Sequence, residues 1–257
     1  MSEFEGLVAM ISGAGGGIGF AAAEALAKSG AKLSLTDVAE SPLAEAAEKL
    51  TGLGAEVLTH LGDIGEEKTS EEWVAATVER FGAVDLAFNN AGIEQPMIPT
   101  HEVPSAMARR VFDIDALGVF YAMKHQIPVM TKQYAESKRV GAVLNTASMA
   151  GVMGAPWLSS YVGAKHAVVG MSKSAAKEYA RAGVRVNALC PSFFRTRMVM
   201  ESLAQAGDDF IRKLTADTPM RRLGEVEEIV PAILFALSPK NGFYTGQELR
   251  VNGGLNC

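Results

Sequence analysis

A glycine-rich turn between a strand pattern and a helix pattern constrains the fold of this chain most strongly. Residues 6–11 (GLVAMI) form a short apolar run of the length expected for a strand buried on both faces. Residues 12–19 (SGAGGGIG) break this run, and residues 20–28 (FAAAEALAK) have a helical pattern that ends before Gly30. A strand, a glycine turn and a helix in this order predict the start of a βαβ unit.

The glycines of this turn are candidates for holding a phosphate group. Glycine permits a tight turn and a close approach of the backbone to a ligand, and the amino end of the following helix attracts anions. The spacing G-x-x-x-G-x-G differs from the common G-x-G-x-x-G pattern, so the turn alone fits either a phosphate cradle or a plain tight turn. The candidate cofactor contacts are Gly13, Gly15, Gly16, Gly17, Ile18 and Gly19.

Asp37 ends the next predicted strand, residues 32–37, and lies 18 residues after Gly19. An acidic residue near this position accepts hydrogen bonds from the adenosine ribose of a bound dinucleotide. Residues 39–48 contain no Lys or Arg that could offset the repulsion of a 2′-phosphate, so the sequence favours NAD over NADP. The alternative is an acidic residue at the amino end of the helix predicted over residues 43–50.

The later strands also end in candidate binding residues. We predict these strands over residues 55–60, 84–88, 140–145, 184–189 and 248–251. The candidates for cofactor contacts are Asp63 and Ile64 after the first of them, and Asn90, Ala91 and Gly92 after the second. Asp63 could instead cap a helix over residues 66–81, and residues 89–92 could form an ordinary polar turn.

Strand and helix patterns alternate along the chain, which predicts an α/β fold with a doubly wound, mainly parallel sheet of the Rossmann type and helices on both faces. We expect residues 1–257 to form a single dinucleotide-binding catalytic domain, and residues 105–135 to be a helical region interrupted at Gly118 and Pro128. Residues 191–224 lack a sustained strand pattern and are rich in apolar side chains, so we predict an irregular substrate lid there. Ligands of such sheets bind at the carboxyl ends of the strands, where the candidates gather.

Tyr161 and Lys165 are four residues apart in a predicted helix over residues 161–180, so they share one helix face. A nearby ammonium favours a phenolate, and we expect Lys165 to lower the pKa of Tyr161 toward the range useful for proton exchange. Ser148, at the end of the fifth strand, could hold the same substrate oxygen. Such a pair is also common on solvated helix faces, and only the glycine turn and the strand before Ser148 favour a site.

Composition excludes several classes of function. The chain has 48% hydrophobic and 21% charged residues and a net charge of -5, which is typical of a soluble globular protein and leaves no basic stripe for nucleic acid. Cys190 and Cys257 form no disulfide framework, and the four histidines form no metal motif, so we expect no metal. The absence of a signal peptide or long apolar segment predicts a cytoplasmic protein that does not bind membranes.

The chain resembles the short-chain dehydrogenase/reductase family over nearly its full length. The resemblance rests on the glycine turn, residues 89–92 (NNAG), Ser148, the Tyr161/Lys165 pair, residues 191–196 and the ending of residues 246–254. It implies a nicotinamide cofactor, catalysis by Ser148, Tyr161 and Lys165, and a homotetramer that uses the helices near residues 108–132 and 161–180. It also implies that Tyr161 and Lys165 contact the cofactor, together with Pro191, Phe193, Phe194 and Thr196.

Two departures from the family pattern fall in the site. Ser192 stands where the family usually has glycine, and Asp115 aligns with the asparagine of the family's catalytic tetrad. That asparagine is thought to carry a proton path through its main-chain carbonyl, which Asp115 keeps. Its negative charge near Lys165 could disturb the relay and shift the pH optimum.

The resemblance and the loops together predict an NAD-dependent oxidoreductase that interconverts a secondary alcohol and its ketone. Apolar residues in the loops expected to line the pocket suggest an apolar or cyclic small molecule: Met97, Met149, Met153, Trp157, Phe193, Phe194, Met198 and Met200. Each of these could instead be ordinary core. The alternative is a protein that binds a nicotinamide cofactor with little turnover, which Asp115 favours. An epimerase or dehydratase of nucleotide sugars fits the glycine spacing less well.

Overall fold

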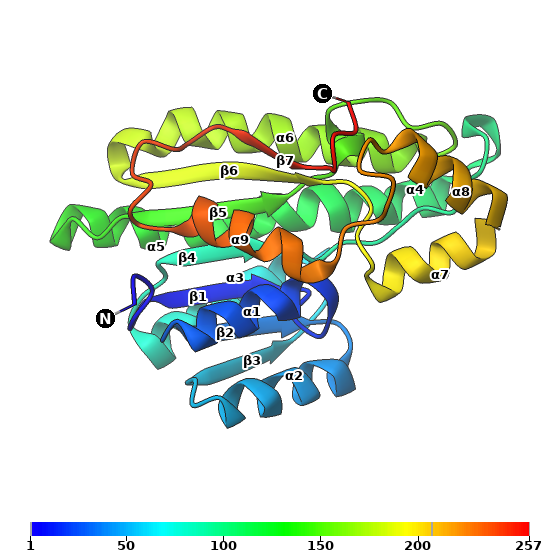
Figure 1. Ribbon diagram of the computed structural model, residues 1–257. Helices are drawn as coiled ribbons and strands as arrows, with labels where there is room; N and C mark the ends of the chain where they lie inside the picture. The colour runs from blue at the N-terminus through cyan, green and yellow to red at the C-terminus, as the bar shows by residue number, and fades with distance from the viewer. Residues whose placement is uncertain (1, 207, 257) are drawn as a thin grey trace.

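The computed structural model describes residues 2–206 and 208–256, so Met1, Gly207 and Cys257 of the predicted 1–257 domain lie outside the described residues. The described chain forms a seven-stranded sheet in the order β3-β2-β1-β4-β5-β6-β7, and every neighbouring pair is parallel (Figure 1). The strands are β1 (Val8–Ser12), β2 (Lys32–Asp37), β3 (Val57–Leu61), β4 (Leu86–Asn89), β5 (Gly141–Thr146), β6 (Val184–Pro191) and β7 (Glu248–Val251). The predicted doubly wound parallel fold is confirmed.

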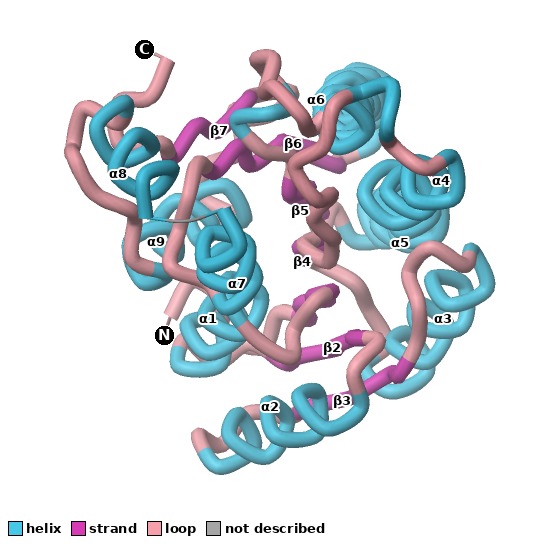
Figure 2. The backbone as a smooth tube through the Cα atoms, turned by 90° about the vertical axis from the view of Figure 1, so that its right-hand side faces the viewer, coloured by secondary structure: helices cyan, strands magenta, loops and turns pink. Residues whose placement is uncertain are grey.

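Helices cover both faces of the sheet, as Figure 2 shows in a view along the strands. One face carries α1 (Gly17–Lys28), α2 (Glu40–Gly52) and α9 (Val226–Leu237), and the other carries α3 (Glu67–Phe81), α5 (Gly118–Ser137) and α6 (Ser159–Tyr179). Neighbouring strand residues alternate between two cores: Ile11 and Leu144 pack under α1 and α9, whereas Met10 and Val143 pack under α5 and α6. Successive side chains of a strand point to opposite faces, so strands buried on both sides are apolar throughout.

The helical region of residues 105–135 differs from its prediction at both expected interruptions. Helix α4 (Ser105–Phe112) continues through a π-helical turn (Asp113–Leu117) into α5, and Pro128 lies inside α5. Gly118 serves close packing instead of a break, because a Cβ atom there would lie 2.7 Å from Cδ1 of Ile64.

The segment predicted as an irregular lid over residues 191–224 is helical. It contains α7 (Arg197–Ala206) and α8 (Asp208–Asp217), which Figure 1 shows beyond the carboxyl ends of the strands. The Thr196 hydroxyl accepts a hydrogen bond from the Val199 amide (3.2 Å) and so caps the start of α7. A bridge between Phe194 and Gly224 brings the two ends of the insertion together. The prediction of irregular structure was therefore wrong, although the strand pattern is absent as expected.

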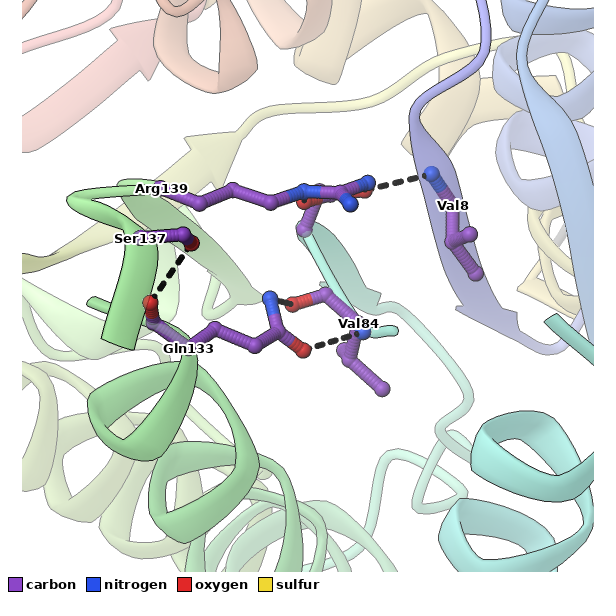
Figure 3. A network of polar contacts seen from close by, with 6 residues as sticks. Val8, Val84, Gln133, Ser137 and Arg139 are labelled. Atoms are coloured by element: carbon purple, nitrogen blue, oxygen red, sulfur yellow. Dashed lines mark hydrogen bonds and ion pairs between the residues drawn. The ribbon is translucent and has the colours of Figure 1, made fainter. Parts of the chain in front are cut away.

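Side chains close the amino edge of the sheet, opposite the predicted site. Asp85 is 1% exposed, accepts a hydrogen bond from the Val8 amide (2.7 Å) and forms a two-pronged ion pair with Arg139. Gln133 of α5 accepts from the amide of Val84 (2.8 Å) and donates to its carbonyl (3.0 Å). Figure 3 shows these residues around the strand starts. The contacts join β1, β4 and α5 at the end of the sheet opposite the predicted site residues.

Among the described residues, no helix is long and apolar enough to cross a membrane.

We expect Asp85→Ala to lower the free energy of unfolding by about 2–3 kcal/mol, because it removes a buried acceptor and leaves Arg139 and the Val8 amide unpaired. Urea denaturation measures this loss. The control is Arg80→Ala, which removes an exposed pair with Glu56 (3.8 Å) and should cost less than about 1 kcal/mol. Equal losses in the two variants would contradict a stabilising role of Asp85.

Candidate active site

A cleft of about 730 Å³ runs along the carboxyl edge of the sheet and collects the predicted site residues. Its lining comes from the turns after β1 to β6, from the start of α6 and from α7. Of the predicted catalytic and cofactor-binding residues, all but Gly19 and Asp115 line this cleft, and those two are buried next to it. Parallel strands end at one edge, which explains how residues from 13 to 196 in the sequence meet there.

The glycine turn at one end of the cleft is shaped by two steric requirements. Gly13 and Gly17 have φ values of 65° and 53°, a backbone region that favours glycine. At Gly19 a Cβ atom would lie 2.1 Å from the carbonyl oxygen of Gly13, so only glycine lets α1 pack this close to the turn. Helix α1 has no side-chain cap, and a Cβ atom at Gly16 would meet nothing within 4 Å. Its first amides therefore face open space that suits an anion.

Asp37 joins this turn to the end of β2. Its two carboxylate oxygens accept hydrogen bonds from the amides of Gly15 (2.9 Å) and Ala39 (3.0 Å). Helix α2 begins just after Asp37, with Ala39 as its N-cap, so Asp37 also lies near the amino end of that helix, as the alternative interpretation expected. The carboxylate lines the cleft beside Val38 and Pro42.

Asp63 follows the end of β3, much as Asp37 lies at the end of β2. It accepts a hydrogen bond from the Gly65 amide (2.9 Å) and forms an ion pair with Arg110 of α4. Helix α3 has Glu66 as its N-cap, so Asp63 does not cap it. Arg110 also lines the cleft, a position that the sequence did not indicate because 47 residues separate it from Asp63.

Asn90, just after β4, is hydrogen-bonded to the ends of β1 and β5. The Ser12 hydroxyl accepts hydrogen bonds from the amides of Asn90 (2.9 Å) and Ala91 (3.1 Å), and the Asn90 side chain donates to the Ser12 carbonyl (3.3 Å). The Thr146 hydroxyl at the end of β5 donates a hydrogen bond to the side-chain oxygen of Asn90 (3.4 Å). These bonds hold β1, β4 and β5 in register at the cleft.

Ser148, Tyr161 and Lys165 meet at the other end of the cleft. The Ser148 side chain shares a hydrogen bond with the Tyr161 phenol, and its oxygen also accepts from the Ala150 amide (3.1 Å). The Lys165 ammonium lies 5.6 Å from the centre of the Tyr161 ring and donates to the Thr146 carbonyl (3.1 Å). The three side chains therefore form one cluster rather than a solvated helix face.

Asp115 lies directly behind this cluster, in the π-helical turn. It is fully buried, and its Oδ1 atom lies 3.6 Å from the Lys165 ammonium and accepts a hydrogen bond from the Ile93 amide (2.9 Å). Its Oδ2 atom has no hydrogen-bond partner among the described residues. A Cβ atom at Gly92 would lie 2.6 Å from Oδ1 and 3.3 Å from the ammonium, so the glycine leaves room for the ion pair.

Comparisons with known proteins agree with this arrangement. The model of a family described as enoyl-(acyl carrier protein) reductase matches residues 13–256. The chain is 38% identical to levodione reductase of Leifsonia aquatica, covering 100% of this chain and 96% of the relative. The chain belongs to the short-chain dehydrogenase/reductase family.

Other family members extend the comparison. Cyclohexanol dehydrogenase of Acinetobacter sp. (strain SE19) is 34% identical, covering 98% of this chain and 96% of the relative. The crystal structure of levodione reductase superposes with a TM-score of 0.93 at 36% identity, covering 98% of each chain. A structure described as NAD⁺-bound xylitol dehydrogenase has a TM-score of 0.91 at 32% identity, covering 98% of this chain and 99% of the other.

The electrostatics of the cluster differ from the simple expectation for a family member. Burial raises the pKa of Tyr161, the Asp115 carboxylate raises it further, and the hydrogen bond from Ser148 opposes both. The expected net lowering of this pKa is therefore not found, because burial and the negative charges of Asp115 and Glu94 raise it. Burial likewise raises the pKa of Asp115, while Lys165 lowers it.

Two further residues of the site gave no signal in the sequence. Gln95 is 2% exposed and forms hydrogen bonds at the start of α6. Burial raises the pKa of Glu94, and a hydrogen bond from the Ser202 hydroxyl of α7 opposes this shift. Both follow the Asn-Asn-Ala-Gly motif, and both line the cleft.

Most of the apolar residues that the sequence suggested for the substrate pocket line the cleft. Of the eight residues named from the sequence, Trp157 and Met200 are not among the lining residues, and six are: Met97, Met149, Met153, Phe193, Phe194 and Met198. Within the described part of the chain, no group of His, Cys, Asp and Glu could hold a metal ion.

We expect Asp115→Asn to lower the pKa of Tyr161, because it removes the negative charge that disfavours the phenolate and leaves the Lys165 charge less compensated. A pH titration of ¹³C-labelled tyrosine by NMR measures the shift. Asp113→Asn, which makes the same change two residues away in the same turn, is the control and should leave the measured pKa of Tyr161 unchanged. A Tyr161 pKa that stays constant or rises in the Asp115 variant would contradict the electrostatic assignment.

Proposed function

We propose that this chain is an NAD-dependent oxidoreductase that interconverts a secondary alcohol, apolar or cyclic, and its ketone. One observation carries the proposal: a single cleft holds an open glycine turn at one end and the hydrogen-bonded Ser148 and Tyr161 with Lys165 at the other. Relatives named levodione reductase and cyclohexanol dehydrogenase support a cyclic substrate.

The glycine turn and the strand ends fit a dinucleotide. The uncapped start of α1 and the open face of Gly16 suit its pyrophosphate, and the Asp37 carboxylate suits the ribose of NAD. Asp63 and Ile64 would lie along the adenine. Asn90, Ala91, Gly92 and Lys165 would hold the nicotinamide half, together with Pro191, Phe193, Phe194 and Thr196. Similar structures described as NAD⁺-bound and as complexed with NADH support this choice of cofactor.

The protein's part of the reaction is to place the substrate oxygen and to move one proton. A bound nicotinamide would supply the hydride acceptor for oxidation and the donor for reduction. The Ser148 hydroxyl holds the substrate oxygen, and Tyr161 takes its proton in oxidation or donates one in reduction. Burial and Asp115 raise the pKa of Tyr161 and so favour the neutral phenol, which is the form that donates a proton in reduction.

The substrate end of the cleft combines an apolar wall with a helical cover. Met97 and Met153 come from the loops after β4 and β5, and Met198, Val199 and Leu203 come from α7. We propose that α7 and α8, within residues 191–224, form the substrate lid. An apolar wall of this kind disfavours sugars and acids and suits a cyclic alcohol or ketone.

A second candidate function is binding of a nicotinamide cofactor with little turnover. Asp115 favours it, because a buried carboxylate 3.6 Å from the Lys165 ammonium occupies the place of the family's asparagine. A screen of secondary alcohols with NAD⁺ and with NADP⁺, followed by the absorbance of the reduced cofactor, separates the two candidates. Cofactor binding without turnover across cyclic and open-chain alcohols would favour the second.

We further propose a homotetramer, as the family resemblance implies. Apolar side chains on α4, the π-helical turn and α5 support it, since Phe112, Leu117 and Phe120 are 41%, 39% and 43% exposed. The cytoplasmic location stays a prediction from the sequence.

We expect Tyr161→Phe to lower kcat about 10³-fold, because the group that exchanges the proton is lost while the ring stays in place. Binding of NADH, followed by its fluorescence, should stay within about threefold of wild type, since the glycine turn is untouched. Turnover equal to wild type would remove Tyr161 from the mechanism.

We expect the wild-type protein to use NAD⁺ at least about 100-fold better than NADP⁺, measured as kcat/KM, because Asp37 repels a 2′-phosphate. Asp37→Asn should reduce this preference about tenfold or more, since it removes the charge and keeps an oxygen for the Gly15 amide. The matched control, Asp63→Asn at the end of β3, changes the same charge and should leave the ratio unchanged. A preference that is insensitive to Asp37→Asn would contradict this role of Asp37.

A further inference from the structure

Gln95 is a buried polar residue that takes no part in the proposed mechanism. It lies in the loop after β4, is 2% exposed, and uses both ends of its side-chain amide. Its oxygen accepts hydrogen bonds from the amides of Ser160 (3.1 Å) and Tyr161 (3.3 Å) and from the Ser160 hydroxyl. Its nitrogen donates to the carbonyl of Trp157 (3.0 Å).

The oxygen of Gln95 closes the amino end of α6. The N-cap residue of this helix, Leu158, provides no side-chain hydrogen bond, so the first amides need an acceptor from elsewhere. Gln95 supplies it from a loop that lies 66 residues before Tyr161 in the sequence. The backbone of Tyr161 is thereby attached to the loop after β4.

The nitrogen of Gln95 holds the loop before α6. Trp157 has a φ of 65°, a conformation that is uncommon for residues other than glycine. Its carbonyl accepts hydrogen bonds from the Gln95 side chain and from the Ile98 amide (3.1 Å). This pair of bonds joins the loops after β4 and β5, and Met97 and Met153 of these loops line the substrate end of the cleft.

We propose that Gln95 is a positioning residue for Tyr161, which it holds against Ser148 while it ties the same helix start to the substrate loop of residues 152–158. The kinetic consequences of this inference rest on the proposed function. Misplacement of a reacting group by about 1 Å costs on the order of 10²-fold in rate. Because Gln95 binds the backbone of Tyr161 itself, loss of its bonds displaces the phenol more directly than loss of a bond elsewhere.

Two substitutions of Gln95 distinguish the role of its side-chain oxygen from that of its side-chain nitrogen. Gln95→Met keeps the volume and removes every hydrogen bond, so kcat should fall about 10- to 100-fold while binding of NADH changes little. Gln95→Glu keeps an acceptor for Ser160 and Tyr161 and loses the donor to Trp157. It should therefore retain kcat within about threefold of wild type and raise the KM of the alcohol.

Gln133→Met is the matched control. Gln133 also uses both ends of its amide, but on the backbone of Val84 at the opposite edge of the sheet (Figure 3). The variant should lose thermal stability and leave kcat and KM unchanged. Ser160→Ala removes one contact of Gln95 and should give a smaller effect in the same direction, which tests the inference independently if Gln95→Met does not fold.

Two measurements that need no turnover complete the experiment. Amide hydrogen exchange at Tyr161 should be at least about tenfold faster in Gln95→Met than in wild type or Gln133→Met. The NMR titration of the labelled Tyr161 ring should also move in Gln95→Met, because its hydrogen bond with Ser148 weakens.

Three outcomes overturn the inference: kcat falls equally in Gln95→Met and Gln133→Met, Gln95→Glu is as impaired as Gln95→Met, or the titration of Tyr161 is the same in Gln95→Met and wild type. Failure of the proposed function is a different result. If wild-type protein oxidises no alcohol with NAD⁺ or NADP⁺, that function is wrong, and the exchange and titration of Tyr161 still decide the role of Gln95.

Discussion

The buried contact between Lys165 and Asp115 is the interaction on which the reactive end of the cleft depends. Lys165 is 3% exposed, and its ammonium lies 3.6 Å from a carboxylate that is fully buried. Removing two such groups from water is costly, and the arrangement persists only when each has a partner of opposite charge and further hydrogen bonds. The Thr146 carbonyl and the Ile93 amide supply those bonds, and Gly92 supplies the space. The pair therefore determines how β4, β5, the π-helical turn and α6 meet.

The same contact explains the state of the Tyr161 phenol. An ammonium that is balanced by a carboxylate stabilises a neighbouring phenolate less than a free ammonium would. Burial then dominates, Asp115 acts in the same direction, and Ser148 alone among the named groups opposes them. Burial and the nearby carboxylate therefore favour the neutral phenol over the phenolate. In the proposed reaction, the neutral phenol is the form that donates a proton to a carbonyl oxygen.

The sequence predicted the sheet and its functional edge well, because both follow from rules that need no knowledge of side-chain contacts. Strands β2 and β7 have the bounds expected from their apolar patterns, and parallel strand ends meet at one edge whatever the details of packing. The helices of residues 191–224 were missed because the lack of a strand pattern was interpreted as irregular structure, although helices lack that pattern as well. Gln95 and Arg110 were missed because their partners lie 65 and 47 residues away. The net direction of the Tyr161 pKa was predicted wrongly because burial has the largest effect on it, and the sequence alone does not show how deeply the phenol is buried.

The amino ends of α1 and α6 face the same cleft but differ in the hydrogen bonding of their first backbone amides. Helix α1 has no side-chain cap, and its first turn borders open space beside Gly16, so its amides remain available to an anion. Helix α6 also lacks a cap of its own, but Gln95 fills that place and its amides are already used. A helix whose first amides are free can bind and release a ligand there. A helix whose first amides are already hydrogen-bonded has its first residues held in place. Tyr161 stands in the closed turn, and rigidity there suits the proposed role, in which its phenol must meet a substrate oxygen in one geometry.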